Sequence, residues 1–287
     1  MLSFPQKMRI AHILNRSLRV ARSLARRDMR VRCRRRGIQW DLDLDEGIDL
    51  AIYLLGTLEP RVLRAYTPLI FPGFTVLDIG ANIGAHTLHF ARLVGPTGRV
   101  FAFEPTDFAI GKLRRNLALN RELAPRVTPH QCFLVADRGA SAPAAVPSSW
   151  PVGDEPAEPC VGDIGRLQST AAAVAITGDD FCANTGIDRI DFIKIDVDGN
   201  EYSVVSGLRR TIERFLPTIL IEFAPFVYEG GHEAEFDELV RFLANCGYDF
   251  TDAGTARPVP REPAALRRLV VPIGAINVLL RPHRANT

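Results

Sequence analysis

Short apolar runs alternate with amphipathic stretches along most of the 287-residue chain. Runs of strand length lie at residues 74–79, 99–103, 127–135, 190–195, 218–223, 248–251 and 275–280. Stretches with helical spacing of apolar residues lie between them at residues 84–93, 107–123, 201–215 and 233–246. Strands that alternate with helices predict a parallel sheet, and the two closing strands are expected to pair as a hairpin. The pattern therefore predicts an α/β, Rossmann-like fold with a seven-stranded, mostly parallel sheet and an antiparallel last strand.

The N-terminal part of the chain has a different pattern. Its apolar residues recur at helical spacing between arginines, which predicts a basic amphipathic helix. Such a helix either lies on an anionic membrane or packs its leucines on its own domain. A short strand and a helix are expected in residues 38–60. We therefore expect a basic N-terminal extension over residues 1–37, an N-terminal cap over 38–73 and the main domain over 74–287.

The main domain is interrupted over residues 138–171. This stretch is rich in alanine, proline, serine and glycine and shows no hydrophobic periodicity. Loops of this length are usually functional lids or disordered segments, so an irregular insertion is expected here. Trp150 within it either stacks on a substrate or fixes its own loop.

Charge is distributed unevenly along the chain. Residues 1–36 carry twelve Lys or Arg and one acid, a net charge of +11, which leaves −9 for the rest of a chain whose formal net charge is +2. The acidic remainder does not favour contact with nucleic acid. The basic segment is compatible with peripheral contact at an anionic membrane surface.

Cysteine use and hydropathy bear on the cellular location. The five cysteines are odd in number and scattered, with no CxxC pair, so neither a disulfide framework nor a zinc site is indicated. No apolar run approaches the about 20 residues of a membrane span, and arginines interrupt any signal-peptide core. We expect a cytoplasmic protein, with peripheral contact at a membrane as an option. A mitochondrial transit peptide is the alternative interpretation of the Arg-rich start.

The strongest chemical signal is the sequence VLDIGANIGAHT at residues 76–87. Gly80 permits a tight turn after the strand, and Gly84 permits a close approach of the following helix. The spacing differs from the GxGxxG of dinucleotide sites, and Asp78 would repel a pyrophosphate but attract the amino group of S-adenosylmethionine. We therefore predict S-adenosylmethionine as the cofactor. Its predicted contacts in this loop are Asp78, Gly80, Ala81, Asn82, Gly84 and Thr87.

A second element predicts contacts for the rest of the cofactor. The strand at residues 100–105 ends in Glu104, at the distance from the glycine loop where an acid accepts hydrogen bonds from ribose hydroxyls. Pro105 follows directly and is included in the predicted site. After the third strand, Asp137 either contacts the adenine amino group or caps its own loop.

Charged residues cluster at the ends of the next two strands. Lys194 and Asp196 are two positions apart at a strand end and therefore share one face, and Glu222 ends the following strand. Central strands of a parallel sheet are normally apolar, so charge at this edge indicates a ligand. Methyl transfer requires alignment of an acceptor atom and removal of its proton. We predict Asp196 or Glu222 as the base or acceptor-orienting group, Lys194 as the holder of local charge, and Asp196 also as a cofactor contact.

The same acids could hold a metal ion. Asp196, Asp198 and Glu222 offer hard oxygen ligands of the kind that bind Mg²⁺. Paired acids at a strand edge more often bind cofactor amines or structural partners. No metal site is therefore predicted.

Four segments together resemble the FkbM-type S-adenosylmethionine-dependent methyltransferases: VLDIGANIGAHT, FAFEPT, DFIKIDVDGNE and PTILIEF. The resemblance covers about residues 38–280 and includes the lead-in WDLDLDEGIDLAIYLLGTLEP. It implies a class I methyltransferase fold and O-methylation of a small-molecule or glycan acceptor, such as a sugar, glycolipid or polyketide. The chain departs from the family pattern KIDVEGxE at Asp198, where the family has glutamate.

Two other functions fit parts of the sequence. The basic N-terminus would suit a methyltransferase of RNA or another nucleic acid, although no Asp/Asn-Pro-Pro-aromatic motif for base amines is present. The second alternative is a non-catalytic, S-adenosylmethionine-binding partner at a membrane. The four acids Asp78, Glu104, Asp196 and Glu222 are intact, which favours an enzyme over such a partner.

Overall fold

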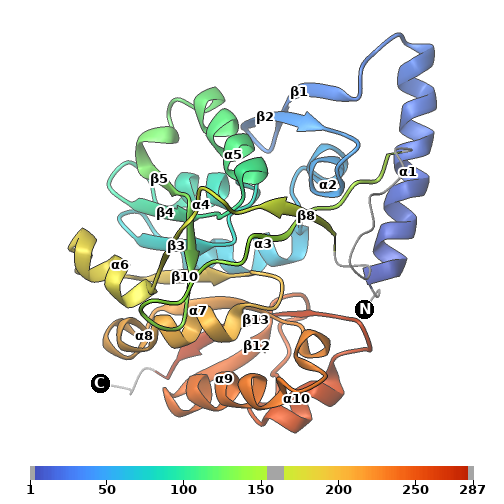
Figure 1. The fold of residues 1–287 in the computed structure, drawn as a ribbon. Helices are drawn as coiled ribbons and strands as arrows, with labels where there is room; N and C mark the ends of the chain where they lie inside the picture. The colour runs from blue at the N-terminus through green and yellow to red at the C-terminus, as the bar shows by residue number, and fades with distance from the viewer. Residues whose placement is uncertain (1–3, 154–164, 284–287) are drawn as a thin grey trace.

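The computed structural model describes residues 4–153 and 165–283. A seven-stranded sheet lies at its centre, in the order β12-β13-β11-β10-β3-β4-β5 (Figure 1). Its strands are β3 (Thr75–Ile79), β4 (Arg99–Phe103), β5 (Val127–His130), β10 (Phe192–Ile195), β11 (Thr218–Phe223), β12 (Tyr248–Asp252) and β13 (Ile276–Pro282). Strand β13 pairs antiparallel with β11 and β12, and the other pairs in this sheet are parallel. The predicted α/β fold with an antiparallel last strand is confirmed.

Helices cover both faces of the sheet, so its central strands are apolar on both sides. Phe192 and Ile193 of β10 are both fully buried, yet they belong to core clusters on opposite faces because successive side chains alternate. One face packs against α6 (Gly178–Thr185), α7 (Glu201–Gly207), α8 (Arg209–Phe215), α9 (Glu233–Asn245) and α10 (Pro263–Leu269). The other packs against α3 (Pro60–Tyr66), α4 (Thr87–Leu93) and α5 (Asp107–Leu119).

Three predicted elements differ from the structure. The helix predicted from residue 84 begins at Thr87, because Gly84 has φ +92°, outside the helical region. The helix predicted at 201–215 is divided into α7 and α8. The strand predicted at 127–135 is divided into β5 and β6 (Cys132–Leu134), and β6 leaves the central sheet to pair with β9 (Val174–Ile176).

The N-terminal part consists of α1 (Phe4–Leu24), the hairpin β1 (Arg30–Arg35) and β2 (Ile38–Asp43), and α2 (Gly47–Leu55). The hairpin crosses the expected division at residue 37. Helix α1 stands at the edge of the molecule beside α2 (Figure 1). The side-chain amide of Asn15 ties α1 to the loop after β2, since it donates to the Leu44 carbonyl at 2.7 Å. Within residues 4–153 and 165–283, no helix is both long and apolar enough to cross a membrane.

The segment expected as an irregular insertion contains an antiparallel ribbon of β7 (Ala145–Ser149) and β8 (Arg166–Ser169). The chain after β7 is attached to the cap, because Gly47 N donates to Trp150 O at 2.8 Å and Val152 N donates to Asp45 O at 2.7 Å. Residues 154–164 of the segment lie outside the described residues. The ribbon therefore connects the insertion firmly to the N-terminal cap.

Candidate functional site

A cavity of about 1380 Å³ lies at the carboxyl ends of the central strands. Its wall includes Gly80 after β3, Glu104 after β4, Asp196 after β10 and Glu222 near the end of β11. Ligands of open α/β sheets bind at this edge, where the strand order reverses. Typical ligand pockets measure about 300–1,000 Å³, so this cavity has room for a cofactor and a second molecule.

The loop after β3 contains three residues with positive φ, Gly80, Asn82 and Gly84. Gly80 has φ +77°, and a Cβ on it would lie 1.8 Å from the carbonyl oxygen of Asp196, so glycine is required here. Asn82 has φ +47°, and its side-chain amide donates to the carbonyl oxygen of Ser148 at 3.2 Å. Gly80, Ala81 and Asn82 all line the cavity. The structure thus brings these three predicted cofactor residues to its wall.

The other three predicted residues of this loop lie behind the wall. Asp78 is fully buried, and its Oδ2 accepts a hydrogen bond from Thr87 Oγ1 at 2.6 Å. Gly84 faces Leu113, whose Cδ1 would lie 2.7 Å from an added Cβ. Asp78, Gly84 and Thr87 are not among the described residues that line the cavity. Asp78 contacts the wall through Lys194, whose Nζ lies 3.7 Å from its Oδ1.

Glu104 is fixed by hydrogen bonds to both of its carboxylate oxygens. Thr106 donates to Oε1 from its backbone N–H at 3.0 Å and from its hydroxyl at 2.6 Å, and Asn82 N–H donates to Oε2 at 3.0 Å. Glu104 is 4% exposed, and this burial raises the pKa of its carboxyl group. Glu104 and Pro105 line the cavity. The carboxylate has one lone-pair site left, on Oε2, to accept a hydrogen bond from a hydroxyl group.

Asp137 does not reach the cavity. It lines a separate depression of about 160 Å³ together with Asp179. Because β6 turns out of the central sheet, the wall near the end of β5 is formed instead by Cys132, Phe133 and Leu134. This mostly apolar surface suits contact with a flat ring.

Lys194 connects the loop after β3 with the end of β10. Its Nζ donates to Gly80 O at 2.8 Å and lies 3.2 Å from Asp196 Oδ2. Burial alone would lower the pKa of Lys194, but the charges of Asp196 and Asp78 outweigh it and the pKa is raised. Lys194 is therefore a buried ammonium group that holds carboxylates from two strands.

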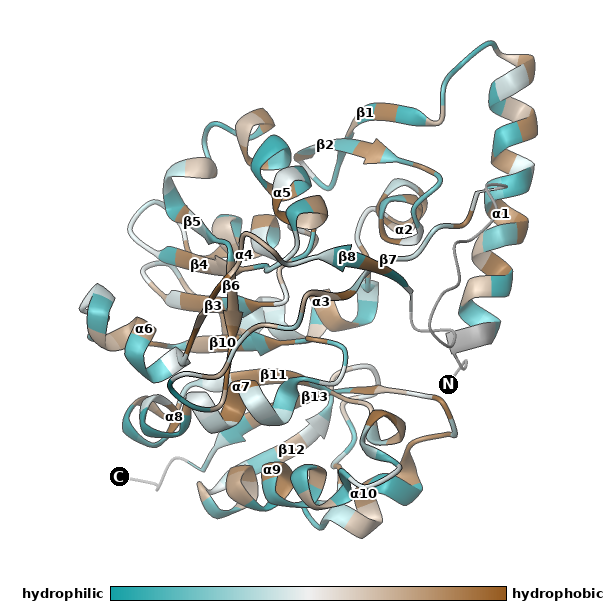
Figure 2. Cartoon of the chain, viewed as in Figure 1, coloured by the Kyte–Doolittle hydropathy of each residue, from teal (hydrophilic) through white to brown (hydrophobic). Residues whose placement is uncertain are grey.

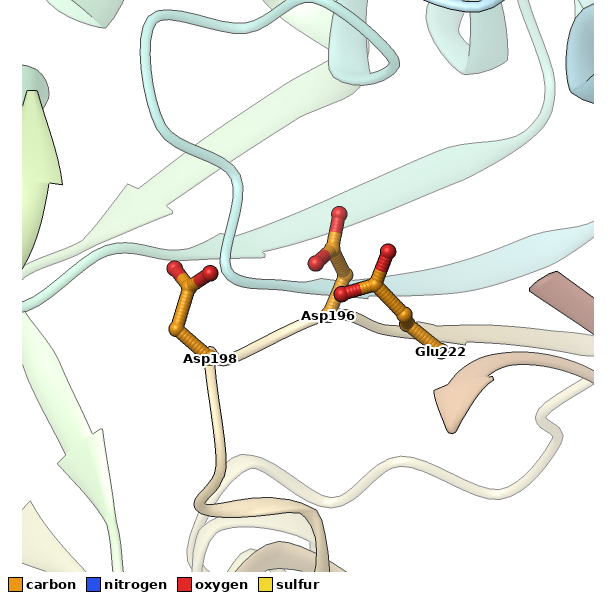
Figure 3. Close-up of side chains that lie close together, drawn as sticks. All are labelled: Asp196, Asp198 and Glu222. Carbon is orange, nitrogen blue, oxygen red and sulfur yellow. The ribbon is translucent and has the colours of Figure 1, made fainter. Parts of the chain in front are cut away.

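Three carboxylates meet on the other side of the cavity (Figure 3). One oxygen from each of Asp196, Asp198 and Glu222 lies within 4.8 Å of the others. Burial, followed by the negative charge of Asp196, raises the pKa of both Asp198 and Glu222 well above the usual range. Carboxylates this close are stabilised by a shared proton or by a cation, including a divalent metal ion. The structure thus brings together Asp196, Asp198 and Glu222, the three acids that the sequence offered as oxygen ligands.

Glu59 is a cavity residue that the sequence did not single out. Asn277 donates to its Oε1 at 3.3 Å, and His86 Nε2 lies 3.9 Å from its Oε2. Burial first, and the charge of Asp196 second, raise the pKa of Glu59 to about 7. Burial also lowers the pKa of His86 well below its usual value, so His86 is neutral beside it. The sequence signals for Glu59 are its place before Pro60, where α3 begins, and its position in the lead-in segment that resembles the family.

Comparison with known proteins gives a family and distant relatives. Residues 78–250 match the model of the methyltransferase FkbM domain. Methyltransferase sdnD of Sordaria araneosa is 28% identical over 173 residues, which cover 51% of this chain and 65% of sdnD. The 31-O-demethyl-FK506 methyltransferase FkbM of Streptomyces tacrolimicus is 29% identical over 160 residues, which cover 48% of this chain and 60% of that protein. The matched region is thus less than two thirds of the length of either relative.

One solved structure with a similar fold is a methyltransferase FkbM from Methylobacillus flagellatus. It superposes with a TM-score of 0.40 and 19% identity, over 76% of this chain and 50% of that one.

Proposed function

The chain belongs to the FkbM methyltransferase family, whose cofactor is S-adenosylmethionine, and we propose that it methylates a hydroxyl group of a sugar, glycolipid, polyketide or similar metabolite. The observation that carries this proposal is one cavity in which Glu104 and residues 80–82 stand beside Asp196 and Glu222. The name of the relative from Streptomyces tacrolimicus, a 31-O-demethyl-FK506 methyltransferase, supports oxygen as the methylated atom.

The cofactor would extend along the ends of β3, β4 and β5. Its methionine part would lie against residues 80–82, a ribose hydroxyl would bind Glu104, and its adenine ring would pack between Pro105 and Leu134. The positively charged sulfonium would then face Asp196 and Glu222. A cation at this place relieves the repulsion within the carboxylate cluster, so the cluster favours the charged cofactor over its neutral product.

Methyl transfer is a direct displacement. A bond forms between the acceptor oxygen and the methyl carbon, the bond from that carbon to sulfur breaks, and its electron pair stays on sulfur. The hydroxyl proton leaves to a carboxylate. We assign Asp196 or Glu222 to this step, or to orienting the hydroxyl, and Lys194 holds Asp196 in place through the ion pair at 3.2 Å. Lys194 is 5% exposed, so its ion pair with Asp196 is only weakly screened by water.

Binding of S-adenosylmethionine tests the cofactor assignment. Calorimetric titration should show binding of S-adenosylmethionine but not of NAD⁺. Glu104→Gln should weaken binding by about 10–100-fold, because a hydrogen bond to a charged group contributes about 1.5–3 kcal/mol. Glu122→Gln, on an exposed residue, should bind as the wild type does. Folded, cofactor-free wild-type protein that does not bind S-adenosylmethionine would refute the proposed function.

Glu59 should determine how the rate depends on pH. We propose that it takes the acceptor proton onward from the carboxylate cluster, which requires its deprotonated form. Because its pKa is about 7, kcat/KM should increase as the pH rises through this value, and the increase should be absent in Glu59→Gln. The measurement is the pH profile of methyl transfer, with Glu122→Gln as the control. A Glu59→Gln profile that matches the wild type removes Glu59 from proton transfer.

We propose a cytoplasmic protein that touches an anionic membrane through α1. The described cysteines are unpaired, as in a reducing compartment, and the exposed residues Arg9 and Arg16 lie seven positions apart on α1. Wild type should sediment with vesicles that contain phosphatidylglycerol more than with pure phosphatidylcholine. Reversing both charges (Arg9→Glu, Arg16→Glu) should weaken this binding by at least about 30-fold, since the loss of two cations alone removes about 1 kcal/mol each. Arg281→Glu, on β13, is the control, and equal sedimentation of both variants contradicts the proposal.

A further inference from the structure

Part of the cavity is bounded by apolar side chains of the two N-terminal helices. Helix α1 contributes Met8, Ile10 and Leu14, and helix α2 contributes Ala51, Leu54 and Leu55. We call these six residues the apolar arm. Figure 2 shows hydrophobic segments on both helices, which stand beside each other at the edge of the molecule.

The apolar arm is poorly covered by the rest of the chain. Ile10 and Leu14 are each 45% exposed, Leu54 is 44% exposed and Leu55 is 55% exposed. Burial of such side chains is favourable, so four of them left open to one cavity are apolar surface that the rest of the chain does not bury. Concave apolar surface of this kind marks a site for an apolar ligand.

The apolar arm and the carboxylate cluster belong to the same cavity. A single molecule can therefore reach both, provided that it has a hydroxyl group at one end and an apolar part at the other. The cofactor, as placed by the proposed function, contacts none of the six residues of the apolar arm.

We propose that the methyl acceptor is an amphiphile whose hydroxyl-bearing end lies at Asp196 and Glu222 and whose alkyl chain lies in the apolar arm. This inference rests on the proposed function. It selects, from the hydroxyl compounds considered above, those that carry a long apolar chain. The chemistry of transfer is unchanged: the acceptor oxygen gains the methyl group, sulfur keeps the electron pair and a carboxylate receives the proton.

A series of n-alkyl β-glucosides tests the arm in the full-length protein. Heptyl, octyl and nonyl glucoside, each as monomers in solution, are titrated into protein saturated with S-adenosylhomocysteine. Each added methylene should tighten binding by up to about fourfold, and glucose itself should not bind measurably. Affinity that does not change with chain length would overturn the proposal.

Two neighbouring residues of α1 provide a matched pair. Leu14→Asp should weaken binding of nonyl glucoside at least about tenfold, since it places a charge in the apolar arm. Ile13→Asp should bind it as the wild type does, because Ile13 is 59% exposed but does not line the cavity. Leu54→Asp repeats the test from α2. Equal binding by Leu14→Asp and Ile13→Asp would overturn the proposal.

Cofactor binding and sedimentation distinguish failure of this proposal from failure of the proposed function. All variants should bind S-adenosylmethionine equally, so wild-type protein that binds the cofactor but no alkyl glucoside overturns the amphiphile and leaves the proposed function standing. Sedimentation is measured in parallel. If Leu14→Asp converts a dimer into a monomer and the wild type binds no glucoside, a second copy of the chain covers the arm and the proposal is wrong.

Discussion

Replacing Asp196 with asparagine should lower kcat for methyl transfer by about 10²–10⁴-fold, the usual contribution of a positioned acid or base. Asp196 stands at the end of β10, where Lys194 Nζ lies 3.2 Å from its Oδ2 and a Glu222 carboxylate oxygen lies within 4.8 Å. The amide keeps the shape of the side chain but neither takes a proton nor carries charge. The rate is measured with labelled S-adenosylmethionine and an alkyl glucoside or another hydroxyl acceptor.

Cofactor binding distinguishes a chemical role of Asp196 from a structural one. Asp196→Asn should weaken S-adenosylmethionine binding by no more than about tenfold, which corresponds to about 1.4 kcal/mol. Asp249→Asn, on the edge strand β12 and with a half-exposed side chain, should change neither rate nor binding. If Asp196→Asn keeps the wild-type kcat, Asp196 is not the base and Glu222 is the remaining candidate.

Replacing Lys194 with methionine should lower the free energy of unfolding by about 3–5 kcal/mol. The variant would leave the fully buried Asp78 without its cation and the Gly80 carbonyl without its donor. Urea denaturation measures the change. The same variant should lose cofactor binding, because Lys194 holds the loop after β3 in place.

A second buried lysine supplies the comparison. Lys112 pairs with Asp49 at 2.6 Å, and neither residue lines the cavity. Lys112→Met should therefore destabilise the protein to a similar extent and still bind S-adenosylmethionine. The double variant Asp78→Asn with Lys194→Met should recover part of the stability, since it removes the unpaired charge. Stability of Lys194→Met equal to wild type would show that the ion pairs at Lys194 contribute little.

The fold was largely predictable because its signal is periodic. Each central strand is a short apolar run, and each run is followed by a stretch with helical spacing, so a sheet of seven strands with an antiparallel last member could be inferred. The points at which a predicted strand or helix is divided in two could not be predicted. The apolar pattern of residues 127–135 continues through the point where the chain leaves the sheet, and only its pairing with β9 reveals the turn.

The part of the candidate site formed by the glycine loop could be predicted, because a single sequence motif determines its backbone conformation. A Cβ at Gly80 would lie 1.8 Å from the Asp196 carbonyl oxygen. The glycine in the motif therefore indicates the close approach of the two segments. Whether a side chain near the end of a strand reaches the cavity wall cannot be inferred from such a motif. Asp78 lies behind the loop rather than on the cavity wall, because its side chain points toward Thr87 and Lys194.

Contacts between distant segments account for the rest. Asp137 was predicted as an adenine contact, and the departure of β6 from the sheet places it in the other depression. Glu59 precedes Asn277 by more than two hundred residues, yet the two share a hydrogen bond in the cavity. No local pattern indicates that pairing, because it joins segments that lie far apart in the sequence.

Helix α1 combines two properties: its outer side carries exposed cations, and its inner side carries Leu14 of the apolar arm. An acceptor dissolved in a bilayer could therefore enter the cavity without passing through water. The enzyme would then respond to the mole fraction of acceptor in the membrane rather than to its bulk concentration. Adding inert lipid at a constant total amount of acceptor would lower this mole fraction and slow turnover.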